Sequence, residues 1–269
     1  MKQDLLCLMR AYPEDITGIK REVDRVYVVM KSGKTILYDD KEEKSIEEKV
    51  NNPDLQDMME QIYPLREIHR LMEKDFDPGR VRVYPLLKEV YGKHQKEVES
   101  NLVNVRVGYK QYPFNRNNKA AEALQRAMEE LGLLLEQQKD IYPFLYPASG
   151  TFNYRIIAGT NRLSPHAFGT AIDLARDKRD YWKWASREAG EKRLQSYPKE
   201  IVEVFEKYHF IWGGKWGHFD ILHFEYRPEL ILKAQYFGDK FVFQKAWYEG
   251  VPLEDPLIKK YIEMIDRVL

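Results

Sequence analysis

Hydrophobic residues recur along the chain with two different periods, which predicts a mixture of helices and strands. An amphipathic helix is expected within the first twenty residues, ending near residues 11–13. Residues 26–30 and 35–38 are rich in β-branched and aromatic side chains and flank a short turn at Gly33, which predicts a β-hairpin. The charge-rich stretch 41–50 is expected to be a solvated loop or helix face.

Helical periodicity returns further along the chain. Apolar positions between residues 53 and 72 predict a helix punctuated by prolines, and residues 102–107 alternate as a strand. A continuous apolar stripe over residues 120–135 predicts a long helix whose stripe faces the core. Another helix is expected to begin near Pro198, and a last one within residues 237–269.

Composition excludes some classes of function but does not identify one. Lys plus Arg and Asp plus Glu are both 43, so the net charge is about zero and no basic surface favours nucleic acid as a partner. The single cysteine, Cys7, excludes an intrachain disulfide and a cysteine-rich metal site; its apolar neighbours predict a buried, inert thiol. No apolar run is long enough for a membrane-spanning helix, and the first residues lack the apolar core of a signal peptide.

Side chains that could bind a metal or take part in catalysis are concentrated in two separated stretches. The first contains Ser164, His166 and Asp173, and the second contains Asp220 and His223. Two imidazoles and one carboxylate form a ligand set that suits Zn²⁺ and leaves one tetrahedral position open. The extra carboxylate, three residues before the second histidine, is placed to handle protons at that position. The pattern therefore points to catalysis rather than to a closed structural zinc site.

Local pattern predicts how the chain presents these side chains. Small residues between His166 and Asp173 indicate a turn that presents the histidine, followed by a strand over 170–174 that presents the carboxylate. Residues 219–224 are expected to be extended, with Asp220 reaching the metal from the preceding bend.

The two stretches together, S-x-H-x-x-G-x-A-x-D and then D/E-x-x-H, resemble the VanX/VanY-type zinc peptidases of bacterial cell-wall peptides. That group includes D-alanyl-D-alanine carboxypeptidases and dipeptidases, and L-alanyl-D-glutamate endopeptidases. The resemblance covers roughly residues 140–230. It implies a zinc ion held by His166, Asp173 and His223, with Asp220 as the catalytic base.

The resemblance also implies that Arg155 binds a substrate carboxylate or the reacting carbonyl oxygen, and that Ser164 lines the substrate cleft. Tyr154 either lines the cleft or packs against its neighbours. Glu225 is either an outer acceptor that orients a ligand imidazole or an exposed acid. An aspartate at position 220, where the carboxypeptidase members usually have glutamate, resembles the endopeptidase branch.

We therefore expect an α+β fold in which a small antiparallel sheet carries the zinc site and helices flank it. Residues 1–115 would form an N-terminal α+β extension, residues 116–235 the catalytic domain, and residues 236–269 a helical segment packed on it. The expected substrate is the stem peptide of peptidoglycan, cut as an L-alanyl-D-glutamate endopeptidase or, alternatively, as a D-alanyl-D-alanine carboxypeptidase. Such a substrate places the protein outside the cytoplasmic membrane, with any export signal absent from this chain.

One alternative belongs to another class. A cell-wall binding module could keep the fold without turnover, since hedgehog-type signalling proteins resemble the same fold. A decayed site would be expected to lack at least one of its residues, whereas here the three ligands, Asp220 and Arg155 are all present.

Overall fold

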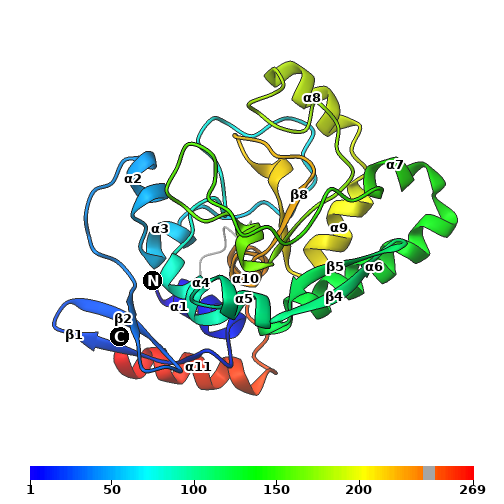
Figure 1. The fold of residues 1–269 in the computed structure, drawn as a ribbon. Helices are drawn as coiled ribbons and strands as arrows, with labels where there is room; N and C mark the ends of the chain where they lie inside the picture. The colour runs from blue at the N-terminus through cyan, green and yellow to red at the C-terminus, as the bar shows by residue number, and fades with distance from the viewer. Residues whose placement is uncertain (239–245) are drawn as a thin grey trace. The chain divides into compact units, whose positions relative to one another are not determined.

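Helices and small antiparallel sheets alternate along the chain in the computed structural model, which describes residues 1–238 and 246–269 (Figure 1). This confirms the predicted α+β class. Contacts along the backbone divide the chain into two units. The first unit comprises Met1–Leu65, Pro78–Val90 and Pro228–Leu269, and the second comprises Arg66–Asp77 and Tyr91–Arg227. The functional boundaries expected after residues 115 and 235 remain a prediction.

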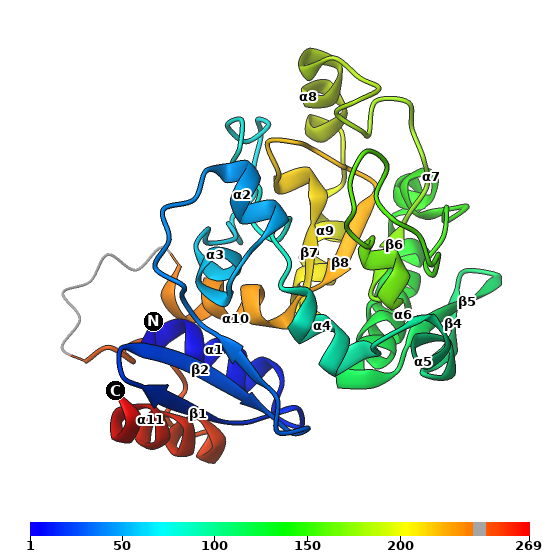
Figure 2. The same ribbon diagram turned by 60° about the vertical axis from the view of Figure 1, so that its left-hand side comes forward.

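The first unit is built around a three-stranded antiparallel sheet of order β1-β2-β3. Helix α1 contacts β1, α10 and α11, and α11 also contacts β1 (Figure 2). Leucines on α1 are fully buried, so this helix supplies much of the unit's core. The elements of this unit are α1 (Lys2–Ala11), β1 (Ile16–Glu22), β2 (Arg25–Met30), β3 (Thr35–Leu37), α2 (Ile46–Asn51), α3 (Leu55–Met59), α4 (Tyr84–Tyr91, whose last residue belongs to the second unit), α10 (Pro228–Phe237) and α11 (Pro256–Val268).

Several expectations for this unit are confirmed and one is wrong. The first helix ends at Ala11 and the hairpin β2–β3 forms as predicted. The helix expected over residues 53–72 is confined to α3, because Asp54 caps its start through a reciprocal capping box and the backbone beyond residue 59 is irregular. Strand β1 was not predicted. Residues 239–245, within the expected C-terminal helical region, lie outside the described residues.

The second unit holds a three-stranded antiparallel sheet of order β6-β8-β7 and a separate hairpin, β4–β5. The predicted strand over residues 102–107 and the predicted helix over residues 120–135 are both confirmed, by β4 and α6. The elements are α5 (Gln95–Ser100), β4 (Leu102–Val107), β5 (Lys110–Asn115), α6 (Ala120–Gln137), α7 (Tyr142–Leu145), β6 (Ala171–Asp173), α8 (Arg187–Gln195), α9 (Lys199–Lys207), β7 (Phe210–Trp212) and β8 (His223–Tyr226), with 3₁₀ turns η1 (Asn117–Lys119), η2 (Lys139–Ile141), η3 (Pro165–Phe168) and η4 (Gly213–Lys215).

Aromatic packing holds the central strand β8 in place. All four of its residues are buried, and the ring of Phe224 stacks on Phe205 of α9 with centroids 4.1 Å apart. Phe210 on β7 meets the same Phe205 ring edge-on at 5.3 Å. Such ring pairs add to the free energy gained by burying apolar area, so α9 fixes the back of the sheet that carries the candidate ligands.

Residues 66–77 come from the N-terminal part of the chain but belong to the second unit. They contact the turn that follows β7. Gly217 N–H donates to the carbonyl of Phe76. The carboxylate of Asp77 accepts two hydrogen bonds from His218, one from its backbone N–H at 2.9 Å and one from Nδ1 at 2.7 Å. This segment therefore fixes the backbone that leads to Asp220.

Cys7 is fully buried, and this burial raises its pKa well above the usual value, as expected for an inert thiol. Within the two described ranges, no helix combines the length and apolar character needed to cross a membrane.

The close approach of residues 66–77 to the turn after β7 should require glycine at position 217. A Cβ there would collide with the backbone carbonyl of Glu73, so Gly217→Ala should lower the free energy of unfolding by about 1–3 kcal/mol. Gly132→Ala is the matched control, because Gly132 lies inside α6 with open space around it and alanine should stabilise the helix by about 0.5–1 kcal/mol. Urea unfolding of both variants tests this; equal stability changes would contradict it.

Candidate metal centre

His166 is presented by a short capped turn. Its backbone N–H donates to the Ser164 hydroxyl at 3.3 Å, and Pro165 occupies the first position of η3. The turn ends at Gly169 with a φ of 67°, where a Cβ would clash with Leu102. The sequence prediction of a turn that presents His166 is confirmed.

A backbone carbonyl fixes the tautomer of this histidine. The Nδ1–H of His166 donates to the carbonyl oxygen of Thr151, which can only accept. The other nitrogen, Nε2, lies 3.2 Å from Oδ1 of Asp173 and is the one that can offer a lone pair to a metal ion. An imidazole held in this way at one nitrogen is the usual form of a metal-ligating histidine.

Asp173 and His223 face each other across the sheet. Strand β6 pairs with β8 in a register that places these two residues directly opposite, and His223 Nδ1 lies 2.8 Å from Asp173 Oδ1. The ring centroids of His166 and His223 are 5.1 Å apart. The ligand atoms of the three residues all lie within 4.8 Å of one another, so together they can hold a metal ion. Two imidazole nitrogens and a carboxylate oxygen fit Zn²⁺ in both donor type and number.

Glu225 lies behind the second imidazole and is almost fully buried, so it is not the exposed acid of the alternative interpretation. Its Oε2 is 3.8 Å from His223 Nε2, on the side of the ring away from Asp173. The buried guanidinium of Arg227 lies 3.5 Å from the other oxygen of Glu225. Trp216 covers another side of the histidine, with ring centroids 5.7 Å apart. These contacts restrict the orientation of His223.

Charge attraction dominates the electrostatics of the cluster. Partial burial works against ionisation of Asp173, but the two imidazoles outweigh it and hold the pKa of this carboxyl well below its usual range. Burial likewise disfavours a charged His223, but the carboxylates of Asp173, Glu225 and Asp220 raise the pKa of His223 to about 10. Without a bound metal, His223 therefore carries a proton at neutral pH.

Asp220 is brought beside the cluster by a tight turn. The N–H of His223 donates to the Asp220 carbonyl at 3.1 Å, and the Asp220 N–H donates to Gly213 at 2.9 Å. This turn corrects the expectation of an extended chain over residues 219–224: the chain folds at 221–222, and β8 begins only at His223. A Cβ on Gly213 would clash with the Asp220 carbonyl, so the glycine allows the approach.

The other predicted residues lie on the loop before η3. Arg155 is exposed and Tyr154 is partly exposed. The carbonyl of Arg155 accepts the N–H of Ser164, and the N–H of Asn153 donates to the His166 carbonyl, so the loop is tied to the turn that presents the first ligand. The Ser164 side chain is buried and its hydroxyl caps η3, which is a positioning contact; its contact with substrate remains a prediction.

Sequence reasoning missed three contributors to this site. Thr151, which orients His166, acts through its carbonyl and so has no side-chain signal. Trp216 packs against His223, and an aromatic residue in an apolar stretch gives no signal of such a role. The pairing of Asp77 with His218 joins residues 141 positions apart, and no local pattern indicates it.

Comparison with known protein families gives independent information about which proteins this chain resembles. Residues 158–226 match the family model described as D-alanyl-D-alanine carboxypeptidase. The resemblance to these peptidases is confirmed over this segment, which contains His166, Asp173, Asp220 and His223 and spans about a quarter of the chain. No curated protein and no solved structure matched the chain.

A second acidic cluster offers a control for metal binding. Carboxylates of Asp39, Asp40 and Asp54 are also close enough to hold an ion, but the buried ammonium of Lys44 already lies 2.5 Å from Asp40 and 3.3 Å from Asp54. An ammonium already lies among those carboxylates, whereas the carboxylate at the candidate metal centre faces imidazoles.

The purified protein should therefore bind one zinc ion per chain, and free zinc at about 100 times its Kd should stabilise it by about 2.7 kcal/mol. Asp173→Asn should remove most of this gain, because the only anionic ligand is lost. Asp40→Asn should keep it. Metal analysis and thermal unfolding with and without zinc test this; stabilisation that survives Asp173→Asn would place the metal elsewhere.

Zinc affinity should also rise with pH. His223 Nδ1 must lose its proton to bind a metal, and its pKa of about 10 means that zinc uptake at pH 7 releases about one proton. The apparent affinity should then increase about tenfold per pH unit below 10. Calorimetric titration in buffers of different ionisation enthalpy counts the protons. Release of none would show that His223 is not a ligand.

Proposed function

We propose that this chain is a zinc-dependent peptidase that hydrolyses the stem peptide of peptidoglycan. The observation that carries the proposal is the convergence of His166, Asp173 and His223 on one point, with Asp220 in the turn that leads directly to His223. The peptidase match over residues 158–226 supports the same reaction class. A closed structural zinc site would leave the nearby Asp220 carboxylate without a role.

In this proposal each residue of the candidate site has a defined role. A zinc ion, when bound, would act as a Lewis acid toward the peptide carbonyl and would lower the pKa of a water molecule. The Asp220 carboxylate accepts the proton of the attacking water and later returns it to the leaving amine. Thr151 and Glu225 keep the imidazoles of His166 and His223 in their binding orientation.

Arg155 is the proposed electrophilic partner. Its side chain is exposed, so it is accessible to a substrate, and its backbone is hydrogen-bonded to the capping residue Ser164 next to the first ligand. A guanidinium in this place can bind a substrate carboxylate, or the negative charge that develops on the carbonyl oxygen during attack. Tyr154, beside it on the loop, is proposed to line the cleft.

The scissile bond separates two candidate activities. The shorter acid at position 220 favours an L-alanyl-D-glutamate endopeptidase, the branch whose members usually carry aspartate there. The description of the matched family favours the second candidate, a D-alanyl-D-alanine carboxypeptidase. Both substrates lie outside the cytoplasmic membrane, and we propose the same location for this protein.

Incubation of the zinc-loaded protein with purified muropeptides, followed by mass analysis, tests the function and the bond together. Scission after the first alanine and loss of a terminal alanine give products of different mass. Asp220→Asn should retain zinc but lower the rate by a factor of about 10²–10⁴, because the proton acceptor is gone. Asp140→Asn, which changes an exposed acid on η2, is the matched control. An inert wild-type protein would leave the binding-module alternative; undiminished turnover by Asp220→Asn would exclude that residue as the base.

A further inference from the structure

An aromatic segment is joined directly to the backbone of the candidate base. Tyr181 forms an antiparallel bridge with Asp220, and the N–H of Trp182 donates to the carbonyl of Phe219 at 3.0 Å. We call the side chains of Tyr181, Trp182 and Trp184 the aromatic platform. Because of this pairing, the platform adjoins the site at Asp220.

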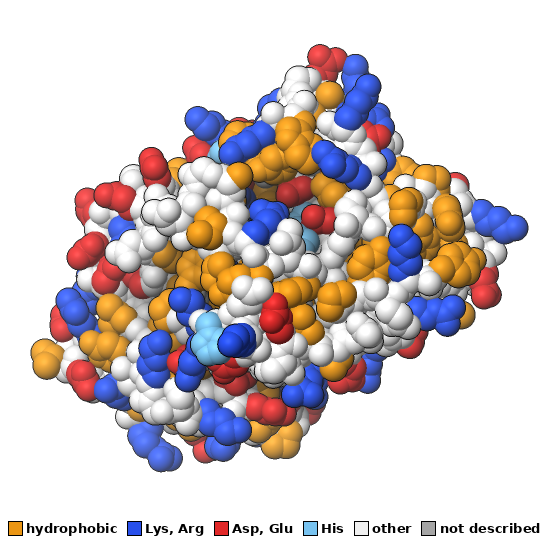
Figure 3. Space-filling model, viewed as in Figure 1, with side chains coloured by type: hydrophobic (Ala, Val, Ile, Leu, Met, Phe, Trp, Pro, Cys, Tyr) orange, Lys and Arg blue, Asp and Glu red, His pale blue; other side chains and the backbone are white. Residues whose placement is uncertain are grey.

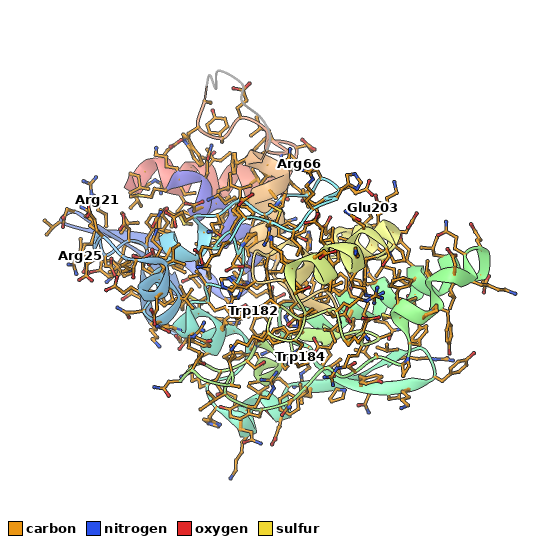
Figure 4. The ribbon with its side chains drawn as sticks, turned by 90° about the horizontal axis from the view of Figure 1, so that it is seen from above. Arg21, Arg25, Arg66, Trp182, Trp184 and Glu203 are labelled. Atoms are coloured by element: carbon orange, nitrogen blue, oxygen red, sulfur yellow. The ribbon has the colours of Figure 1, made fainter. Side chains whose placement is uncertain are left out.

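The platform is open to solvent although its side chains are large and apolar. Trp184 is 57% exposed and Trp182 is partly exposed. Both come from the segment between β6 and α8 (Figure 4). Figure 3 shows a hollow over β8 where acidic and histidine side chains gather, with hydrophobic and basic side chains above it. Exposed aromatic groups beside a polar site are typical of surfaces that bind a ligand.

The rings are held in place before any ligand arrives. Backbone N–H groups of Trp184 and Ala185 both donate to the carbonyl of Tyr181, which closes the turn. The Tyr181 and Trp184 rings meet edge-on with centroids 4.9 Å apart, and the Arg176 guanidinium lies 4.4 Å from the Trp184 ring. A surface that is already ordered loses little conformational entropy on binding.

The position and charge of the platform indicate its ligand. The proposed stem peptide is joined through its first alanine to a sugar of the glycan strand, so a sugar ring lies within reach when the site holds the bond after that alanine. The C–H face of a sugar ring can stack on an indole, while the exposed cations Arg176 and Lys183 can attract the acidic peptide. A stem peptide has no aromatic side chain that would need such a surface.

We infer that the aromatic platform binds a sugar ring of the glycan strand next to the scissile peptide. The inference rests on the proposed function, and it makes glycan-linked stem peptides the substrate class of this site. Trp184 contacts the sugar in this arrangement, and Arg176 positions the Trp184 ring.

Kinetics on two matched substrates test the inference: a stem peptide linked to its disaccharide and the same peptide without sugar. Trp184→Ala should lower kcat/KM about tenfold on the linked substrate, mainly through KM, and leave the free peptide unchanged. Trp184→Phe should restore much of the loss. Tyr109→Ala, at a 92% exposed aromatic in the β4–β5 turn, should affect neither substrate. Thermal unfolding checks that each variant is folded.

The possible failures are distinguishable. An equal loss on both substrates would mean that Trp184 serves the peptide or the site itself, and no loss on either would also overturn the inference. If the wild-type protein cleaves neither substrate, the proposed function fails. Binding of a peptide-free N-acetylglucosamine tetramer then tests separately whether the aromatic platform binds sugar. Quenching of tryptophan fluorescence in the wild type but not in Trp184→Ala supports sugar binding; identical responses of the two proteins contradict it.

Discussion

A single carboxylate between two imidazoles is the interaction on which this site depends. Asp173 Oδ1 lies within hydrogen-bonding range of both His166 Nε2 and His223 Nδ1, and each residue comes from a different part of the second unit. The register of β6 against β8 sets this arrangement. A slip of one residue would turn either Asp173 or His223 to the opposite face of the sheet and disperse the ligands.

The surrounding structure serves mainly to hold that register and those ring orientations. Phe205 and Phe224 fix the sheet from behind, and the buried pair of Glu225 and Arg227 limits rotation of His223. A buried charge pair of this kind contributes little net stability, but its position is strongly restricted. The carboxylates of Asp173, Glu225 and Asp220 act on His223 and raise its pKa, and such an arrangement of charges suits a bound cation.

The sequence predicted best those features that are local. Helix α6 and strand β4 follow their apolar periods closely and were predicted from them. The ligand set comes from two distant stretches, but it could be proposed because His, Asp and a further acid have few joint uses at that spacing. Features that arise from contacts between distant segments were not predictable. Residues 53–72 have helical periodicity, yet only α3 is helical. The turn at 221–222 is set by the hydrogen bond between His223 and Asp220, and the segment 66–77 is held by Gly217 and His218.

X-ray absorption at the zinc edge of the metal-loaded protein tests the central claim most directly, because it reports the atoms around the ion without reference to activity. We predict four light-atom neighbours at about 2.0–2.2 Å, with multiple-scattering features of two imidazoles and with oxygen in the remaining positions. In Asp173→Asn the shell should change while the imidazole signal persists. A sulfur neighbour near 2.3 Å, or a shell of oxygens without imidazole, would contradict the assignment of His166, Asp173 and His223 as the ligands.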